Sequence, residues 1–165
     1  YSIRKTQQTL DGLKIALVGD LKYGGTVHSL VEAMSNFNTE FHLVSPTELK
    51  LPSTVKRFIK GANLEYHQYT ELEDVMGLAD IVYMTRIQRE RFSEPMEYEK
   101  VKNSYVLTKD MLHGSKENMR VLHPLPRVNE ISEDVDESPK AYYFQQALNG
   151  VYVRQALLAA ILGLK

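Results

Sequence analysis

Short apolar runs alternate along this chain with longer stretches that carry polar residues and candidate helix caps. Runs of this length, bounded by turn residues, predict strands, and the stretches between them predict helices. Such alternation is typical of an α/β domain with a doubly wound, mostly parallel sheet flanked by helices. The expected strands cover residues 14–18, 40–44, 64–67, 81–84 and 120–122.

The predicted helices begin at residues whose side chains accept hydrogen bonds from the first helical turn. Thr26 is expected to cap a helix that ends at residue 36, and Ser53 is expected to cap one that ends at residue 60. Thr70 is expected to cap a shorter helix that ends at residue 76. A further short helix, with charges on its outer face, is expected at 96–102.

The segment 142–164 predicts one long helix at the C-terminal end of the sequence. Its part from 156 to 162 is apolar on every side, whereas a helix on a domain surface needs only one apolar stripe. Seven residues are too few to cross a bilayer. We therefore expect this apolar surface to be covered by protein.

The composition limits the classes of function. At 165 residues, of which 43% are hydrophobic, the chain suits one domain with a buried core. A formal net charge of −1 provides no basic field for nucleic acid. Cysteine is absent, which excludes disulfides and thiolate chemistry and makes the cytoplasm the default compartment. No run is long and apolar enough to predict a membrane span.

Three polar motifs follow directly after predicted strands. They are Gly19-Asp20-Leu21-Lys22-Tyr23-Gly24-Gly25, Thr85-Arg86-Ile87-Gln88-Arg89-Glu90-Arg91 and His123-Pro124-Leu125-Pro126-Arg127. Ligands of open parallel sheets bind beyond the carboxyl ends of the strands, so we expect the three motifs to converge on one site. In the third motif the two prolines restrict the backbone, and Leu125 is expected to direct its carbonyl outward.

The order and spacing of these motifs resemble the C-terminal, aspartate-binding half of the aspartate carbamoyltransferases. The similarity runs through nearly the whole chain, and it includes Glu130-Ile131, Asp134-Val135-Asp136 and Tyr143-Phe144-Gln145-Gln146. The resemblance implies an enzyme of pyrimidine biosynthesis. Such an enzyme transfers a carbamoyl group from carbamoyl phosphate to the α-amine of L-aspartate, with no metal or organic cofactor.

The resemblance also divides the chemistry between two domains. In the family, a Ser-Thr-Arg-Thr phosphate loop and the histidine that polarises the carbonyl belong to an N-terminal carbamoyl-phosphate domain, and neither motif occurs here. We therefore interpret residues 1–10 as the remnant of an interdomain helix and residues 11–165 as the aspartate-binding domain. The apolar helix is expected to pack against the missing domain. The domain alone is expected to contain no catalytic residue and to be inactive, and the full-length enzyme is expected to be a homotrimer.

Residue by residue, the resemblance places the aspartate site in two of the motifs. Arg86 matches the arginine that binds the side-chain carboxylate of aspartate, and its planar fork suits a bidentate contact. Gln88 matches a residue that helps to hold the substrate. In the segment Pro124-Leu125-Pro126, the carbonyls of Pro124 and Leu125 match backbone acceptors for the carbamoyl amide and the attacking amine.

Without the resemblance, the arginines of the second motif have another interpretation. Arg86 and Arg91 fit as solvated surface cations that pair with Glu90 and Glu94. With the resemblance, we favour the binding site.

The third motif also contains a histidine and an arginine without a direct role in the substrate site. We interpret His123 as a hydrogen-bonded residue that anchors the loop, because the family's functional histidine lies in the other domain. Arg127 either adds positive charge to the cleft or pairs with Glu130 or Asp134 to hold the loop. We favour the pair.

Two further segments have open roles. Lys22 either adds to the positive field of the cleft or pairs with Asp20 or another acid. Glu97 and Tyr98 lie in the middle of a segment that closes over the substrates in the related enzymes, and the same residues also fit a solvated connector helix.

Position 25 is the sharpest departure from the family pattern. The family carries an arginine there that binds the α-carboxylate of aspartate, whereas this chain has Gly25. Loss of a bidentate, charge-assisted contact costs on the order of 2 to 5 kcal/mol, or roughly thirtyfold to several-thousandfold in affinity. We therefore expect this domain to bind aspartate weakly even when its partner domain is present.

Two alternative functions remain open. An ornithine carbamoyltransferase shares the architecture, but its substrate has a cationic side chain that an arginine-rich strand end would repel. A non-catalytic paralogue that uses the apolar helix for assembly is supported by Gly25. The presence of Arg86, Gln88 and the Pro124-Leu125-Pro126 segment argues against it, since a scaffold does not need them.

Overall fold

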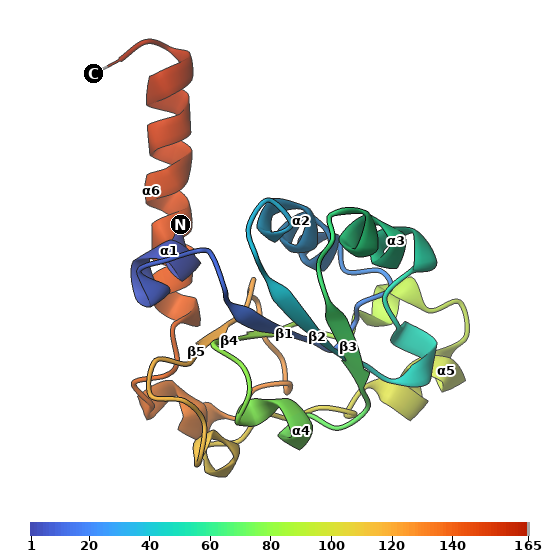
Figure 1. Ribbon diagram of the computed structural model, residues 1–165. Coiled ribbons are helices and arrows are strands. Elements are labelled where there is room, and N and C mark those ends of the chain that lie inside the picture. Colours follow the sequence, from blue (N-terminus) through green and yellow to red (C-terminus); the bar gives the residue numbers. More distant parts are fainter. Residues whose placement is uncertain (165) are drawn as a thin grey trace.

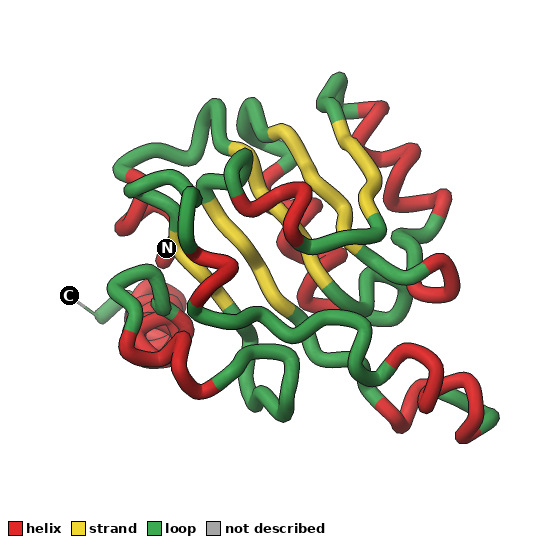
Figure 2. The backbone as a smooth tube through the Cα atoms, turned by 90° about the horizontal axis from the view of Figure 1, so that it is seen from below, coloured by secondary structure: helices red, strands yellow, loops and turns green. Residues whose placement is uncertain are grey.

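The computed structural model describes residues 1–164 and contains a five-stranded sheet in which all strands are parallel (Figures 1 and 2). Residue 165, the last of the predicted domain, lies outside the described residues. The strands are β1 (Lys14–Val18), β2 (Glu40–Val44), β3 (Tyr66–Tyr69), β4 (Ile81–Met84) and β5 (Arg120–Leu122). Their order is β3-β2-β1-β4-β5, so the sheet grows outward from β1 in both directions and the doubly wound fold is confirmed.

Strand β3 is the one strand whose predicted bounds are wrong. It was expected at 64–67 and lies at Tyr66–Tyr69, at the edge of the sheet, with its side chains partly or fully exposed. Tyr66 is paired with Phe41 and Tyr69 with Val44, so the backbone pairing with β2 determines where β3 begins and ends. The apolar residue Leu64, which suggested an earlier start, precedes the strand.

The helices lie where the sequence predicts them, but the expected caps are wrong. Their bounds are α1 (Ser2–Gln7), α2 (Gly25–Met34), α3 (Ser53–Gly61), α4 (Glu73–Met76), α5 (Pro95–Val101) and α6 (Tyr143–Ile161). None of Thr26, Ser53 and Thr70 caps its helix, because α2 begins before Thr26, at Gly25, α3 begins at Ser53 itself, and α4 begins three residues after Thr70.

The sheet is buried on both faces, because successive side chains of a strand point to opposite sides. In β1, Ile15 and Leu17 belong to one core, and Ala16 and Val18 belong to the other. Helices α2 and α3 cover the first face, and α4 lies on the second (Figure 1).

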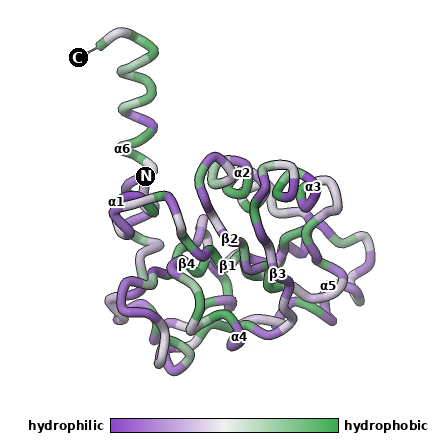
Figure 3. Tube along the Cα trace, viewed as in Figure 1, coloured by the Kyte–Doolittle hydropathy of each residue, from purple (hydrophilic) through white to green (hydrophobic). Residues whose placement is uncertain are grey.

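Helix α6 is divided into a packed half and a projecting half (Figure 1). Tyr143 at its start is fully buried and Asn149 is 1% exposed. The later part extends away from the sheet and is rich in apolar residues, as Figure 3 shows, and the large apolar side chains there are exposed: Leu157, Leu158, Ile161 and Leu162. Within residues 1–164, no helix is long and apolar enough to cross a membrane.

The register of the sheet determines where the three polar motifs lie. Val18, the last residue of β1, is paired with Met84, the last residue of β4, and Tyr83 is paired with Leu122 at the end of β5. The loops that follow these three neighbouring strands therefore leave the sheet along one edge, near the point where the strand order reverses.

Candidate functional site

The loops that follow β1, β4 and β5 surround a cavity of about 440 Å³, which we call the strand-end cavity. It is lined by every residue that the sequence assigned to the substrate site: Gly25, Arg86, Gln88, Pro124, Leu125 and Pro126. The other lining residues are Asp20, Tyr23, Gly24, Thr26, Thr85, Arg91 and His123. The predicted convergence of the three motifs is confirmed, and their part in binding aspartate stays a prediction.

A close contact joins the ends of β1 and β4 beside this cavity. Gly19 has a φ of 109°, and a Cβ at this position would lie 2.4 Å from the carbonyl oxygen of Thr85. The Thr85 hydroxyl donates a hydrogen bond to the Val18 carbonyl at 2.8 Å and accepts one from the Asp20 N–H at 3.1 Å. Only glycine fits position 19, and the Thr85 side chain ties the first two motifs together.

Asp20 places a carboxylate in the cavity wall. The residue is 1% exposed, and its Oδ1 accepts hydrogen bonds from the backbone N–H groups of Lys22 and Tyr23 at 3.1 and 2.9 Å. Its Oδ2 has no hydrogen-bond partner among the described residues. Burial raises the pKa of Asp20, and the two N–H groups only partly offset this effect. Asp20 therefore holds the loop after β1 through the two hydrogen bonds at its Oδ1.

Two arginines provide the positive charge of the cavity. The Nη2 of Arg86 donates a hydrogen bond to Glu90 Oε1 at 2.8 Å. The side chain of Glu90 is 60% exposed. Arg91 donates from Nε to Gln88 Oε1 at 3.0 Å. The surface pair expected for Arg86 is therefore present, and the pair expected between Arg91 and Glu94 is not found among the described residues. An exposed ion pair of this kind is weak, so a ligand carboxylate can displace Glu90.

His123 anchors the proline-containing loop, as predicted. The His123 ring accepts a hydrogen bond at Nδ1 from the Leu125 N–H at 2.8 Å, so its proton is on Nε2, which donates to Glu130 Oε1 at 2.7 Å. Oε2 of Glu130 accepts from the N–H groups of Val128 and Asn129, both at 3.1 Å. Burial opposes ionisation of Glu130, but the hydrogen bonds from His123 and the backbone outweigh it and lower the pKa of the carboxyl group.

This anchoring fixes the backbone that faces the cavity. Leu125 has a φ of 55°, and the Leu125–Pro126 peptide bond is cis. Leu125 was expected to lie outside the right-handed helical region, and it adopts a left-handed conformation. The hydrogen bond from its N–H to His123 stabilises this conformation. The Gln146 side chain also accepts a hydrogen bond from the His123 N–H at 2.9 Å.

Arg127 holds the other end of the loop, but its predicted partners are wrong. It pairs with Asp136, with Nη2 at 2.6 Å from Oδ2, and neither Glu130 nor Asp134 is within ion-pair distance. Glu130 is turned inward to His123, which leaves Asp136 as the carboxylate that the guanidinium reaches. The buried Tyr143 hydroxyl also donates to Asp136. The hydrogen bonds from Arg127 lower the pKa of Asp136.

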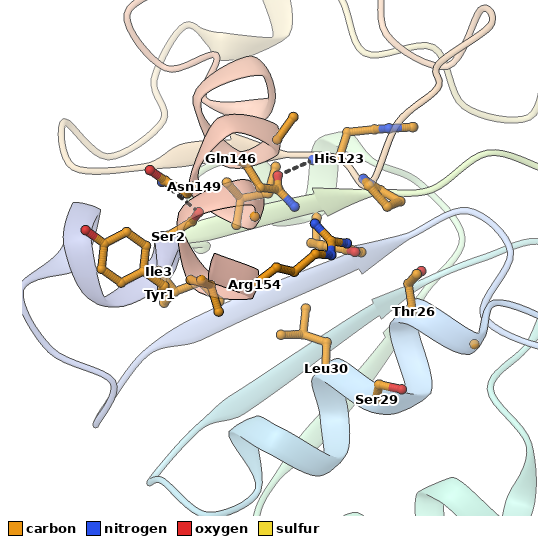
Figure 4. Close-up of a pocket in the computed structure, with 17 residues that line it drawn as sticks. Tyr1, Ser2, Ile3, Thr26, Ser29, Leu30, His123, Gln146, Asn149 and Arg154 are labelled. Carbon is orange, nitrogen blue, oxygen red and sulfur yellow. Dashed lines mark hydrogen bonds between the residues drawn. The ribbon is translucent and has the colours of Figure 1, made fainter. Parts of the chain in front are cut away.

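A larger cavity of about 760 Å³ adjoins the strand-end cavity, and Figure 4 shows its lining. It lies between α1, α2 and α6, and we call it the helix cavity. Gly25 borders both cavities, and no atom lies within 4 Å of the position that a Cβ would take there. Arg154 is the charged residue that helps to line the helix cavity, whereas the strand-end cavity contains three charged groups. The smaller cavity is therefore the better candidate for polar chemistry.

Several predicted residues have other positions or were missed. Lys22 does not line the strand-end cavity, and its Nζ lies 4.8 Å from the centre of the Tyr23 ring. Thr85 and Arg91 were not assigned to the substrate site, although both belong to the polar motif that follows an apolar strand, and this motif was the signal. Within the part of the chain that the structure describes, no group of three or more His, Cys, Asp or Glu side chains is arranged to hold a metal ion.

Comparison with known proteins agrees with this geometry. The family model for the aspartate/ornithine carbamoyltransferase Asp/Orn binding domain matches residues 11–161. The chain belongs to this family.

The relatives with established names are catalytic subunits of aspartate carbamoyltransferase. The catalytic subunit from Bacteroides fragilis is 59% identical over 165 residues, which cover 99% of this chain and 54% of the relative. The chain therefore spans about half the length of the curated relatives it matches.

Solved structures show the same relationship. The catalytic subunit of M. jannaschii aspartate transcarbamoylase has a TM-score of 0.88 and 48% identity, and the match covers 96% of this chain and 51% of that one. The aspartate transcarbamoylase from Trypanosoma cruzi in complex with aspartate and phosphate has a TM-score of 0.83 and 35% identity, with coverage of 95% and 49%. The Asp/Orn binding domain fold of this chain is thus shared with proteins of known structure.

Proposed function

We propose that this chain is the aspartate-binding half of an aspartate carbamoyltransferase, which makes N-carbamoyl-L-aspartate and phosphate from carbamoyl phosphate and L-aspartate in pyrimidine biosynthesis. The observation that carries the proposal is the convergence of Arg86, Gln88, Pro124 and Leu125 on one cavity. Two arginines in that cavity favour a dicarboxylate over the cationic side chain of ornithine.

The chemistry assigned to this half is positioning. The guanidinium of Arg86 holds the side-chain carboxylate of aspartate, and the carbonyls of Pro124 and Leu125 accept hydrogen bonds from the carbamoyl amide and the attacking amine. This orients the nitrogen lone pair toward the carbonyl carbon of carbamoyl phosphate. Stabilisation of the oxyanion and of the leaving phosphate belongs to the other domain.

The domain organisation is part of the same proposal. Residues 1–10 belong to an interdomain helix and residues 11–165 to the aspartate-binding domain, and a carbamoyl-phosphate domain completes the site. The exposed apolar half of α6 supports a covering partner, because Leu157, Ile161 and Leu162 are 58%, 79% and 68% exposed. The homotrimer and the cytoplasmic location also belong to this proposal, and they rest on the family resemblance and on the absence of cysteine.

A titration followed by amide-resolved NMR tests the aspartate site in this chain. L-aspartate is expected to shift the amides of Arg86, Gln88 and the 123–127 loop in a saturable way, and L-ornithine is expected to leave them unchanged. The variant Arg86→Gln is expected to lose the response, while Arg57→Gln, a change at an exposed arginine on α3, retains it. Equal responses to the two ligands would contradict the assignment of substrate.

The complete activity is tested in a chimera that joins the N-terminal half of the Bacteroides fragilis relative to this chain. Formation of carbamoyl aspartate is the expected result, with a high KM for aspartate because of Gly25. Substitution Gly25→Arg is expected to lower the KM by roughly thirtyfold or more, since nothing within 4 Å of the Cβ position obstructs a side chain. An unchanged KM in the arginine variant would show that position 25 does not determine affinity.

A further inference from the structure

A group of titratable side chains lies between β1, β2 and β3, outside both cavities. Glu40 is at its centre, and its Oε2 lies 3.2 Å from Lys14 Nζ. Its Oε1 lies 3.1 Å from His42 Nε2 and 3.4 Å from His67 Nε2. One carboxylate therefore faces three side chains that can be positively charged. We call these four residues the histidine cluster.

The register of the sheet brings the histidine cluster together. Lys14 is paired with Glu40, and His42 is paired with His67 on the next strand. Residues two apart on a strand point to the same face, so Glu40 and His42 share a face of β2. The two imidazole rings are stacked, with their centroids 5.6 Å apart. His42 is 1% exposed, whereas the side chain of His67 is 49% exposed.

The surroundings of His42 favour its neutral form. Its Nδ1 forms a hydrogen bond of 3.0 Å with the Tyr69 hydroxyl. Its Nε2 has no hydrogen-bond partner among the described residues, although Glu40 is close. Burial lowers the pKa of His42, and the nearby Glu40 carboxylate only partly offsets this effect.

The other elements around His42 provide no further negative charge for an imidazolium. Helix α4 covers this face of the sheet with the apolar side chains of Val75 and Met76. Lys116, which precedes β5, adds positive charge near His42 and is bound to Asp80 at 2.8 Å. Among residues 1–164, no carboxylate other than that of Glu40 lies within 4.0 Å of either imidazole of the cluster. Since Lys14 already balances that carboxylate, charging both histidines leaves an excess of positive charge.

Strand β3 is the element most easily displaced by this excess charge. It is the edge strand and is paired only with β2. None of its four residues is fully buried, so few apolar contacts oppose its separation from β2. Strands β1 and β4, in contrast, have a neighbour on each side.

We propose that His42 and His67 form a pH-sensitive switch, in which protonation of both rings in mildly acidic solution loosens β3 from β2. Histidine is the side chain whose charge ordinarily changes between about pH 5 and 8. The closed strand binds the His42 proton less readily than the open strand, so a fall in pH favours opening. The switch is independent of the proposed aspartate site, because β3 contributes no residue to the strand-end cavity.

Amide hydrogen exchange followed by NMR tests the switch in the complete chain. Protection factors, corrected for the intrinsic exchange rates, are measured at about pH 7 and about pH 5.5. This interval lies above the range in which Glu130 and Asp136, whose pKa values are lowered, take up protons. The variants are His42→Gln and His67→Gln, which remove one titrating ring each. The matched control is His113→Gln, because the side chain of His113 is 85% exposed and lies outside the cluster.

In the unchanged chain, protection of the amides between β2 and β3 is expected to fall by about fivefold to tenfold at the lower pH, because one unit of pKa difference corresponds to tenfold. Protection between β1 and β4 is expected to stay constant. His42→Gln abolishes the fall, His67→Gln reduces it, and His113→Gln retains it.

Three results would overturn the proposal. They are protection of β3 that stays constant or rises at pH 5.5, an equal fall in β3 and β4, and an undiminished fall in either cluster variant. A rise would show that a charged His67 pairs with Glu40 and tightens the strand. The half-exposed position of His67 makes His67→Gln the variant that decides the question if His42→Gln does not fold.

Discussion

The two walls of the strand-end cavity are built in opposite ways. The proline wall, residues 123–127, is held by side-chain bonds to Glu130, Gln146 and Asp136, which lie outside the loop, and its His123 is 1% exposed. In the arginine wall, residues 85–91, Thr85 alone is tied to another strand, and the remaining side-chain bonds stay within the segment. The 3-10 turn Arg89–Arg91 has no buried residue.

This difference corresponds to the two kinds of group that the walls present. A backbone carbonyl cannot change its direction without movement of the backbone, so it orients a ligand only if the loop that carries it is fixed. Guanidinium groups lie at the ends of long side chains and adjust to a carboxylate without a rigid backbone. Strong anchoring is therefore required on the proline wall and is unnecessary on the arginine wall.

The largest expected effect comes from the proline wall. Substitution Glu130→Ala leaves the His123 Nε2–H and two backbone N–H groups without their acceptor in a buried site. We expect the free energy of unfolding to fall by about 3 kcal/mol, because buried unsatisfied donors are costly. Urea denaturation with linear extrapolation measures this value. A loss as small as that of a surface substitution would show that the dyad does not hold the loop.

Removal of the second anchor is expected to cost less. Asp136→Ala breaks the contacts to Arg127 and Tyr143, but the carboxylate is 29% exposed, so solvent screens part of the interaction. We expect a loss of about 1 to 2 kcal/mol in the same urea measurement. Asp134→Ala, a change at an exposed residue of the same turn, is the matched control and is expected to be neutral. Equal losses in both variants would contradict the anchoring role of Asp136.

Strong acid is expected to loosen the proline wall. The folded state lowers the pKa of Glu130 and Asp136, so both contribute stability above their unfolded pKa values near 4, and this stability disappears as the pH falls through the lower folded values. Asp20 acts in the opposite direction, because burial raises its pKa. Unfolding measured between pH 7 and 3 is expected to show a shallower acid loss in Glu130→Gln than in the unchanged chain. Identical pH profiles would exclude Glu130 as a source of the acid sensitivity.

The smallest effect is expected on the arginine wall. Glu90→Ala removes the exposed partner of Arg86 and is expected to change the free energy of unfolding by less than about 0.5 kcal/mol. Because the freed guanidinium no longer has to leave Glu90, aspartate affinity is expected to rise by about twofold. Titration of Glu94→Ala, a neighbouring exposed acid, provides the control. A large loss of stability in Glu90→Ala would show that the arginine wall is as firmly held as the proline wall.

Local sequence was sufficient for most of the architecture. Strands β1, β2, β4 and β5 have the predicted bounds, because nearly all of their side chains are buried and an apolar run then coincides with the strand. Strand β3 lies at the edge, where burial is partial, so pairing with β2 set its ends. The predicted caps were wrong, because none of the three helices has a hydrogen bond from a capping side chain.

For the site, the sequence by itself determined which residues gather beyond the strand ends. A parallel sheet brings the segments after neighbouring strands to one edge, and polar residues directly after apolar runs mark those segments. It also determined the absence of a cation at position 25.

Only the tertiary structure decided which of these groups are already paired. Arg127 contacts Asp136 and not its nearer neighbours in sequence, Glu130 faces His123, and Arg91 has no carboxylate partner within residues 1–164. Partner choice depends on the direction of each side chain and on the burial around it, and both are set by contacts between segments far apart in the chain.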